Sequence, residues 1–359
     1  MRILYTCGRE PEYSRNAVLQ ACLRASFPVF AATDRSSNLP LRYLRVATKL
    51  LRAPAEYDLA CVGFLGQPLV PLVRRITRRP ILFDAFLSVY DALCYDRRRF
   101  APRSLAGRLA YWLDRTSCAQ ANLVMLDTQA HARYFHKTFG VPMEKLTHLF
   151  VGCDENVFFP RPDAQPGFVL FYGSFLPLHG LEVIIRAAKL LEADARIHFR
   201  VIGNGLEYPR IRRLADQLQL SNMEFLPPVP LSDLPVQIAG AALCLGGHFS
   251  GSDKAQRVIA GKTFQCLAMG KPTIVGDNVA NRELLTPGYD AWFCRPGDAE
   301  ALAQAILALT NTPDLGVHLG KNAHATFLAR ASIAALSQQV RQMVESFASP
   351  SQTPAPKTD

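Results

Sequence analysis

Three cations stand close together in residues 242–277, a stretch rich in side chains that could bind an anion. Lys254, Arg257 and Lys262 follow an apolar run that ends at Gly247. Arg257 and Lys262 lie in or beside a predicted helix, because the apolar residues there recur at intervals of three and four. The amino end of a helix carries free N–H groups and a partial positive charge, which favour anions. We therefore predict a phosphate or diphosphate ligand; a basic, solvated helix face is the alternative.

Two further turns carry glycines directly after predicted strands. In the segment FYGSFLPLHG, a strand ends at Gly173, and the loop that follows holds Ser174 and His179. Glycine lets a ligand approach the backbone, and these two side chains could reach the oxygens of a diphosphate; an ordinary loop role for His179 is the alternative. Gly203 and Gly205 form a second turn of this kind, although such a pair often only makes the turn.

In the first half of the chain, the turn over residues 8–16 joins the first predicted strand to the first predicted helix. In a doubly wound sheet this turn faces the ligand cleft. Its polar side chains are therefore candidates for holding an anionic or hydroxyl-rich acceptor: Arg9, Tyr13, Arg15 and Asn16.

Carboxylates mark the ends of two more strands in this half. Asp84 ends the fourth predicted strand, and Asp91 follows seven residues later. A carboxylate at a strand end can orient or deprotonate a hydroxyl nucleophile. Capping of the next segment is the competing role, and it weighs more for Asp91 than for Asp84. Asp127 and Thr128 stand at another strand end, where capping the next helix is the preferred interpretation.

The elements that would position these residues form two α/β domains. Short apolar runs alternate with helical patterns over residues 1–152, which predicts a parallel, doubly wound sheet. Residues 153–167 contain three prolines without periodicity and predict a linker. The alternation restarts over residues 168–347, so a second Rossmann-like domain should face the first across a cleft, with the last helices free to cross back. Residues 348–359 are predicted to be disordered.

Composition supports a two-domain globular protein of a reducing compartment. A chain of 359 residues is long for one core. No apolar run approaches the roughly 20 residues of a membrane span, and the amino terminus runs into a strand without the apolar core of a signal peptide. The nine cysteines are scattered without paired spacing, so neither a disulfide framework nor a metal site is expected. We predict a cytoplasmic protein.

The positive charge is confined to the first half. Residues 1–150 have a net charge of +11 and the remainder a net charge of −1. The arginines form clusters around residues 42–52, 74–79 and 97–108, and leucines accompany the first cluster. A basic face beside leucines can lie on an anionic membrane surface such as the inner face of the plasma membrane; an arginine-rich solubilising surface is the alternative. Nucleic acid is not expected, because no nucleic-acid motif or aromatic platform is present.

The strings FYGSFLPLHGLE, VIGNGLE and KTFQCLAMGKPTIVGD, in this order after an α/β half, resemble retaining glycosyltransferases of the GT-B fold, specifically family 4. The resemblance implies that the second domain binds a nucleotide-sugar donor and the first domain an acceptor, either a glycan, a lipid-linked glycan or another hydroxyl compound. It implies hexosyl transfer with retained configuration, without a metal or an organic cofactor. The base of the donor would be read around Leu226.

Several positions depart from the family pattern. The Glu-x7-Glu pair of the family falls on Arg257 and Gln265. Gln265 keeps an acceptor for ribose hydroxyls, whereas Arg257 is expected to pair with phosphate. The Arg and Lys that clamp the diphosphate in the family fall on Ser174 and His179, so Lys254 and the other two cations of this region would have to supply the charge.

The implied mechanism rests on charge. Arg257 and Lys262 would stabilise the negative charge of the departing nucleoside diphosphate. Asp84, near the place of a family histidine, would orient the acceptor hydroxyl. The departures also permit a catalytically silent binding or scaffold subunit. A nicotinamide-dependent dehydrogenase or an epimerase is disfavoured, because the Gly203–Gly205 turn has Tyr208 where a third glycine would stand.

Overall fold

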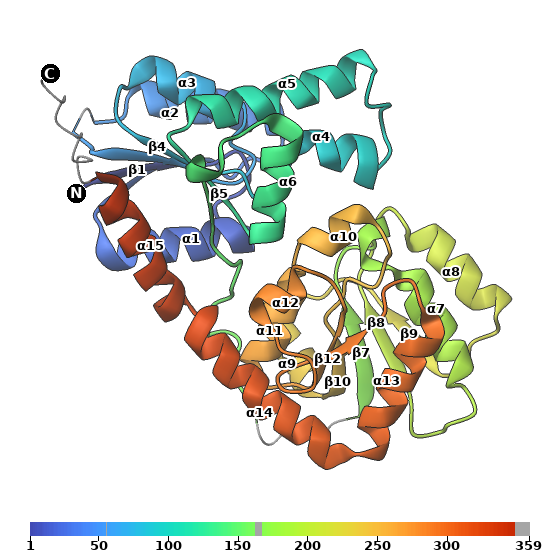
Figure 1. Cartoon of the computed structure of the whole chain (residues 1–359). Helices are drawn as coiled ribbons and strands as arrows, with labels where there is room; N and C mark the ends of the chain where they lie inside the picture. The colour runs from blue at the N-terminus through green and yellow to red at the C-terminus, as the bar shows by residue number, and fades with distance from the viewer. Residues whose placement is uncertain (55, 162–166, 349–359) are drawn as a thin grey trace, which may run out of the picture.

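The computed structural model describes residues 1–54, 56–161 and 167–348, which form two α/β domains (Figure 1). Each domain contains a six-stranded sheet in which all strand pairs are parallel. The fold class predicted from the alternation of strands and helices is therefore confirmed. Residues 162–166 of the predicted linker and residues 349–359 of the predicted tail lie outside the described residues.

The sheet of the first domain has the order β2-β1-β3-β4-β5-β6. Its strands are β1 (Ile3–Thr6), β2 (Val29–Ala32), β3 (Leu59–Val62), β4 (Ile81–Asp84), β5 (Leu123–Leu126) and β6 (Leu146–His148). Every residue of β1, β3 and β4 is buried, as expected for parallel strands that are covered on both faces.

Helices cover both faces of this sheet. They are α1 (Ser14–Ser26), α2 (Leu39–Leu51), α3 (Leu69–Ile76), α4 (Val89–Asp91), the π-helical turn η1 (Ala92–Asp96), α5 (Leu105–Gln120) and α6 (Gln129–Phe139). A 3₁₀ turn, η2 (Met143–Lys145), precedes β6. The apolar residues of α2, α3, α5 and α6 share one core, whereas those of α1 belong to another on the opposite face. Helix α6 shows how the sequence sets its limits: the Thr128 hydroxyl accepts from the His131 N–H, and Gly140 ends the helix at φ +68°.

The sheet of the second domain has the order β12-β11-β10-β7-β8-β9. Its strands are β7 (Phe168–Tyr172), β8 (Phe199–Ile202), β9 (Met223–Leu226), β10 (Ala241–Leu245), β11 (Thr273–Gly276) and β12 (Trp292–Cys294). One core on this sheet unites α7 (Leu181–Leu190), α8 (Tyr208–Gln217) and α13 (Ala299–Asn311). The other face is covered by α9 (Leu234–Ala239), α11 (Gly261–Ala268), α12 (Asn281–Leu284) and α14 (Pro313–Arg330). A 3₁₀ turn, η3 (Pro177–His179), precedes α7.

The last helix returns to the first domain. Helix α15 (Ile333–Ala348) lies along α1, and Val340 and Val344 share a core with Val18 and Cys22 (Figure 1). The Glu155 carboxylate accepts from the first N–H groups of α15, which fixes its start. Within the described part of the chain, no helix combines the length and the apolar character that crossing a bilayer requires.

One local prediction is wrong in a way that matters for the site. The segment expected as one helix is divided into α10 (Asp253–Arg257) and α11 (Gly261–Ala268), and Val258 between them is extended at φ −130° and ψ 146°. The three cations therefore do not surround one helix start. Lys254 and Arg257 belong to α10, and Lys262 alone lies in the first turn of α11.

Candidate active site

A pocket of about 220 Å³ opens where β7 ends and α11 begins. Its lining comes from both domains: Tyr172, Gly173, His179, Gly261, Lys262 and Gln265 from the second, and Ser14 and Gly152 from the first and the connection. The pocket thus lies at the carboxyl edge of a parallel sheet, which is the common ligand position in such folds. The sequence-predicted Gly173, His179, Lys262 and Gln265 are brought together here.

Lys262 is the cation of this pocket. Its side chain is buried, and its Nζ lies 3.1 Å from Nδ1 of His179 and 4.7 Å from the centroid of the Phe171 ring. Burial lowers the pKa of this amine to about 7. Gly173 has φ +137°, and a Cβ there would come within 3.3 Å of Cε of Lys262. The glycine therefore keeps open the space in front of the amine.

Two histidines lie close to Lys262: His179, which lines the pocket, and His248 next to it. The rings of His179 and His248 are 4.9 Å apart, and their Nδ1 atoms are separated by 3.2 Å. Burial and the neighbouring Lys262 hold the pKa of both imidazoles well below the usual range. Both rings are therefore neutral at pH 7, so the positive charge of this cluster belongs to Lys262.

Gln265 and Tyr172 form a polar pair on the pocket wall. The Tyr172 hydroxyl donates to Oε1 of Gln265 at 2.8 Å, which leaves the amide N–H groups of Gln265 to serve as donors. Lys262 and Gln265 are three residues apart on α11 and therefore lie on the same side of the helix.

The other residues predicted for donor binding have different surroundings. A Cβ at Gly203 would come within 2.0 Å of the Gly173 carbonyl oxygen, and one at Gly205 within 2.7 Å of the Phe175 nitrogen. These glycines thus allow two loops of the chain to pack against each other, and the expectation that they line the ligand pocket is corrected. Ser174 is exposed and Leu226 half-buried at the end of β9; neither lines this pocket.

Arg257 does not point into the pocket, contrary to its predicted pairing with phosphate. Its Nη2 donates to Oδ1 of Asp91 at 2.7 Å, and its guanidinium lies 3.8 Å from the centroid of the Tyr134 ring. Both partners belong to the first domain, and Asp91 is buried. Arg257 therefore joins the two domains, and Asp91 is occupied by this ion pair. Asp91 also lines a larger cleft between the domains, so its assignment to acceptor binding stays a prediction.

Lys254 makes a second bridge across the domains. Its Nζ lies 2.8 Å from Oδ2 of Asp96, and both side chains are largely buried. Together the two bridges stand beside a larger interdomain cleft of about 870 Å³. Lining residues of the cleft include Tyr95, Arg97, Arg98, Glu207 and Ser252. Lys254 thus borders this cleft rather than the smaller pocket.

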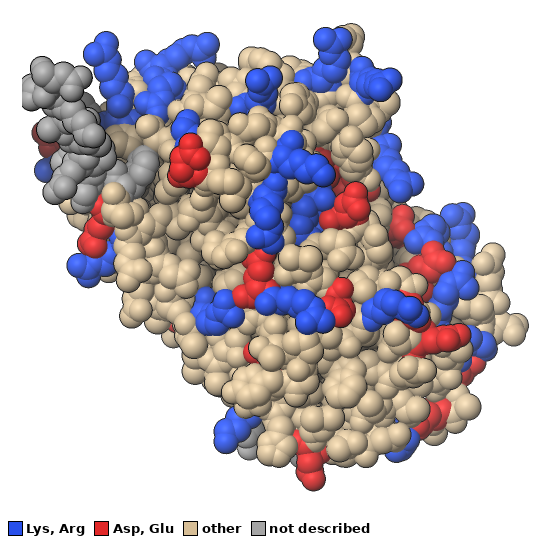
Figure 2. Space-filling view, viewed as in Figure 1, with Lys and Arg blue, Asp and Glu red and all other residues tan. Residues whose placement is uncertain are grey.

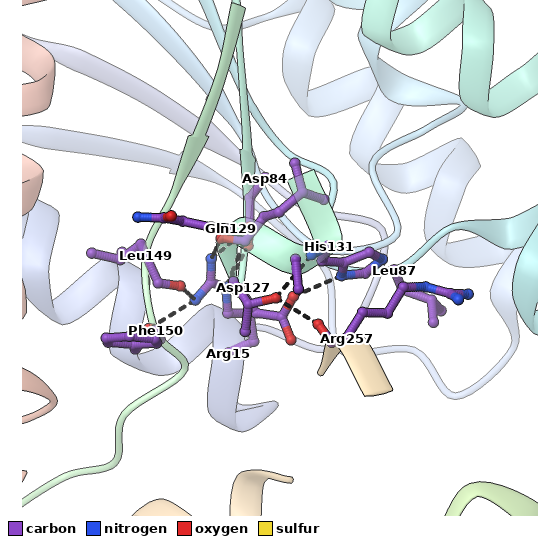
Figure 3. A network of polar contacts seen from close by, with 12 residues as sticks. Arg15, Asp84, Leu87, Asp127, Gln129, His131, Leu149, Phe150 and Arg257 are labelled. Carbon is purple, nitrogen blue, oxygen red and sulfur yellow. Dashed lines mark hydrogen bonds and ion pairs between the residues drawn. The ribbon is translucent and has the colours of Figure 1, made fainter. Parts of the chain in front are cut away.

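Asp84 and Arg15 form a buried ion pair inside the first domain (Figure 3). Arg15 donates through Nη2 and Nε to the Asp84 carboxylate at 2.8 and 3.0 Å, and through Nη1 to the carbonyl oxygens of Leu149 and Phe150. Neither side chain is accessible. The predicted roles of Asp84 in orienting an acceptor and of Arg15 in binding one are therefore corrected: the pair fixes β4 and α1 to the segment after β6.

The remaining residues of the first turn divide into a buried and an exposed group. Asn16 is buried and accepts from the Phe64 N–H and the Tyr5 hydroxyl, so it is structural and not an acceptor ligand. Tyr13 is 37% exposed, and Arg9 stacks over its ring at 5.3 Å. These two remain available at the surface.

Besides the pocket glycines Gly152 and Gly261, three residues that contribute side chains to the site were not predicted: Ser14, Tyr172 and His248. Ser14 lines the pocket from the start of α1. Tyr172 is the last residue of β7, and His248 follows the glycines after β10. Each lies next to a predicted site residue, so the proximity of strand ends was an available signal for all three.

Comparison with known proteins agrees with this geometry. The family model described as Glycosyl transferases group 1 matches residues 166–312. The structure superposes on that of Anabaena Alr3699/HepE in complex with UDP-glucose with a TM-score of 0.73 at 17% identity, covering 96% of this chain and 100% of that one. The chain has the GT-B fold of glycosyltransferases. The expected resemblance is confirmed at this level, whereas family 4 stays a prediction.

One more solved structure and one curated relative are similar to this chain. Sucrose-phosphate synthase (tll1590) from Thermosynechococcus elongatus superposes with a TM-score of 0.75 at 15% identity, covering 96% of this chain and 99% of that one. The putative colanic acid biosynthesis glycosyltransferase WcaL of Escherichia coli (strain K12) is 27% identical over 176 residues, which are 48% of this chain and 43% of WcaL. The match therefore spans less than half the length of this curated relative.

Proposed function

We propose that this GT-B protein transfers a hexosyl group from a nucleoside-diphosphate sugar to a hydroxyl of a glycan or lipid-linked acceptor. The observation that carries the proposal is the pocket in which Lys262 and Gln265 face Gly173 at the start of α11. It lies within the segment that matches group 1 glycosyl transferases.

The donor would bind with its diphosphate at Lys262. The ammonium group and the free N–H groups of the first turn of α11 both favour an anion. The amide of Gln265, oriented by Tyr172, would donate to the ribose hydroxyls. UDP is the first donor nucleotide to test, because the structurally similar HepE was crystallised in complex with UDP-glucose.

The reaction follows from the charge that develops on the leaving group. As the bond between the anomeric carbon and the diphosphate oxygen breaks, negative charge grows on the diphosphate, and the Lys262 ammonium stabilises it. The acceptor oxygen bonds to the anomeric carbon from the same face, and a diphosphate oxygen takes the acceptor proton, which retains the configuration. In this scheme the chain itself supplies the positive charge, so we propose transfer without a metal or an organic cofactor.

The acceptor would enter through the interdomain cleft. Arg97, Arg98 and Tyr95 line it and offer contacts for an anionic or hydroxyl-rich molecule. All nine cysteines are free and buried, which fits the reducing cytoplasm in which we place the reaction. A catalytically silent subunit is less favoured. The pocket keeps a cation in Lys262, an amide in Gln265 that can donate hydrogen bonds to ribose hydroxyls, and Gly173, which leaves space in front of the cation.

The test is donor turnover by purified protein. We expect release of nucleoside diphosphate from one member of a panel of UDP, GDP, ADP, CDP and dTDP sugars in the presence of mixed glycan acceptors, unchanged by EDTA. Lys262→Met should reduce the rate at least tenfold, because the diphosphate loses its cation. The matched control is Lys189→Met, which removes an exposed lysine of α7 that pairs with Glu192. Equal rates in both variants would refute the role of Lys262.

A further inference from the structure

Helix α5 presents an apolar stripe to the outside of the first domain. Leu105, Leu109 and Trp112 are 86%, 62% and 56% exposed, and their spacing of four and three places them on one side of the helix. The opposite side of α5, which includes Ala110 and Cys118, is buried against the domain. Large side chains with this exposure on one helix face indicate an interaction surface.

Arginines surround this stripe. Six of them are exposed on α5 and on the segment that leads into it: Arg97, Arg98, Arg99, Arg103, Arg108 and Arg115. None of the six forms an ion pair within the described residues. The two acidic residues of this segment and helix are engaged elsewhere: Asp96 is paired with Lys254, and Asp114 is buried and accepts from the Ser88 hydroxyl. Figure 2 shows Lys and Arg gathered along the side of the first domain that carries α5, with few acidic groups between them.

Helix α2, whose basic cluster suggested a membrane surface from the sequence, differs from α5. Arg42 is buried and pairs with Glu10, and Lys49 lies 3.7 Å from a carboxylate oxygen of Asp34. Its cations are thus largely committed within the protein. The free positive charge and the larger apolar exposure lie on α5.

We propose that the outward face of α5, with the arginine segment before it, docks on an anionic lipid bilayer. Leucine and tryptophan side chains enter the boundary between headgroups and acyl chains, while guanidinium groups contact lipid phosphates. A second copy of this chain is a poor occupant, because a symmetric contact would place two sets of six unpaired arginines against each other. A bilayer supplies both the apolar layer and the anions that this face lacks.

The docking face continues into the interdomain cleft. Arg97 and Arg98 line that cleft and also begin the arginine segment, so a molecule held in the bilayer could reach the cleft along them. This step rests on the proposed function and names the acceptor class as membrane-held. The docking itself does not depend on catalysis.

The experiment is vesicle flotation of the full chain. We expect binding to vesicles of phosphatidylcholine that contain about 30% phosphatidylglycerol, because this anionic lipid attracts cations. Binding to vesicles of phosphatidylcholine alone should be weak. The triple variant Leu105→Ser/Leu109→Ser/Trp112→Ser should bind at least tenfold more weakly. The control Val317→Ser/Leu328→Ser removes comparable exposed apolar groups from α14 and should bind like the wild type.

A spectroscopic readout places the contact. The chain has two tryptophans, so a Trp292→Phe background leaves Trp112 as the reporter, and its emission should shift to the blue on anionic vesicles. The proposal would be overturned if the triple variant bound vesicles as well as the wild type, or if the wild type bound none. It would also be overturned if the triple substitution changed only the self-association of the chain and not its vesicle binding. Nucleoside-diphosphate binding measured on the triple variant separates failure of docking from failure of the proposed function, since it should be unchanged.

Discussion

The amine of Lys262 is buried, so its charged form is poorly solvated. The proposed chemistry nevertheless needs that charge, to stabilise the departing diphosphate. Burial lowers its pKa to about 7, and both neighbouring histidines are held neutral. A bound diphosphate would favour the ammonium form, so donor binding above pH 7 should take up a proton.

Donor affinity should therefore fall as the pH rises. If only the ammonium form binds, the Kd of a nucleotide sugar increases about tenfold from pH 6 to pH 8, because the free amine loses its proton through a pKa near 7. A nucleotide sugar is the proper ligand, since its diphosphate does not titrate in this range. Calorimetry at several pH values provides the measurement. Lys262→Arg should bind with little pH dependence, and a wild-type Kd that is flat from pH 6 to pH 8 would contradict the assignment.

At this scale the sequence identifies residue types but not their partners. Lys262 and Gln265 were recognised because they lie on one predicted helix and match family positions. Asp84 and Arg15 were misassigned because their pairing joins residues 69 positions apart, which local spacing cannot reveal. The same limit applies to Arg257, whose partner lies in the other domain.

Helix α10 acts as the connector between the domains. Arg257 and Lys254 lie on it and pair with Asp91 and Asp96 of the first domain. The Thr128 hydroxyl donates to the Arg257 carbonyl oxygen, which adds a contact from the start of α6. Glu283 of α12 accepts from the N–H groups of Gln129 and Ala130, again at the start of α6. The closed arrangement is therefore held by contacts between short helices.

The Arg257–Asp91 pair should stabilise the protein more than a surface pair. Arg257→Ala leaves the buried Asp91 carboxylate without its partner and should lower the free energy of unfolding by about 3 kcal/mol. The double variant Arg257→Ala/Asp91→Ala should cost less than the sum of the single variants. Arg2→Ala is the control, because Arg2 and Glu56 are exposed and such pairs contribute at most about 1 kcal/mol. Urea unfolding measures all four variants. Additive single effects would show that the pair is not coupled.

Element boundaries were predictable where apolar periodicity and caps agree, as in α6 and the strands of both sheets. The division between α10 and α11 was not predictable, because the helical spacing of apolar residues continues across it. Val258, Ile259 and Ala260 are buried in the extended link, so tertiary packing satisfies the same apolar pattern without a helix.

The whole molecule is organised around the edges of two sheets that face each other. In the orders β2-β1-β3 and β10-β7-β8, both β1 and β7 have a neighbouring strand on each side, so the loops that follow them leave from within the sheets and not from their outer strands. Ser14, beyond the first of these loops, meets Gly173 and Lys262 in one pocket. Because α15 returns to α1, the two domains also share a continuous core. The sequence predicted the two sheets, since their alternating pattern is repeated, but the closed interface depends on pairs that only the folded chain brings together.

The central claim is that the pocket at Lys262 binds a nucleoside diphosphate. Thermal unfolding with UDP, GDP, ADP, CDP and dTDP, each with and without EDTA, tests it most directly. We predict that one diphosphate at 100 times its Kd stabilises the wild type by about 2.7 kcal/mol without regard to EDTA. The same concentration should stabilise Lys262→Met much less and Lys189→Met as much as the wild type. If none of the five diphosphates raises the unfolding temperature, the pocket is not a donor site and the proposed transferase activity is contradicted.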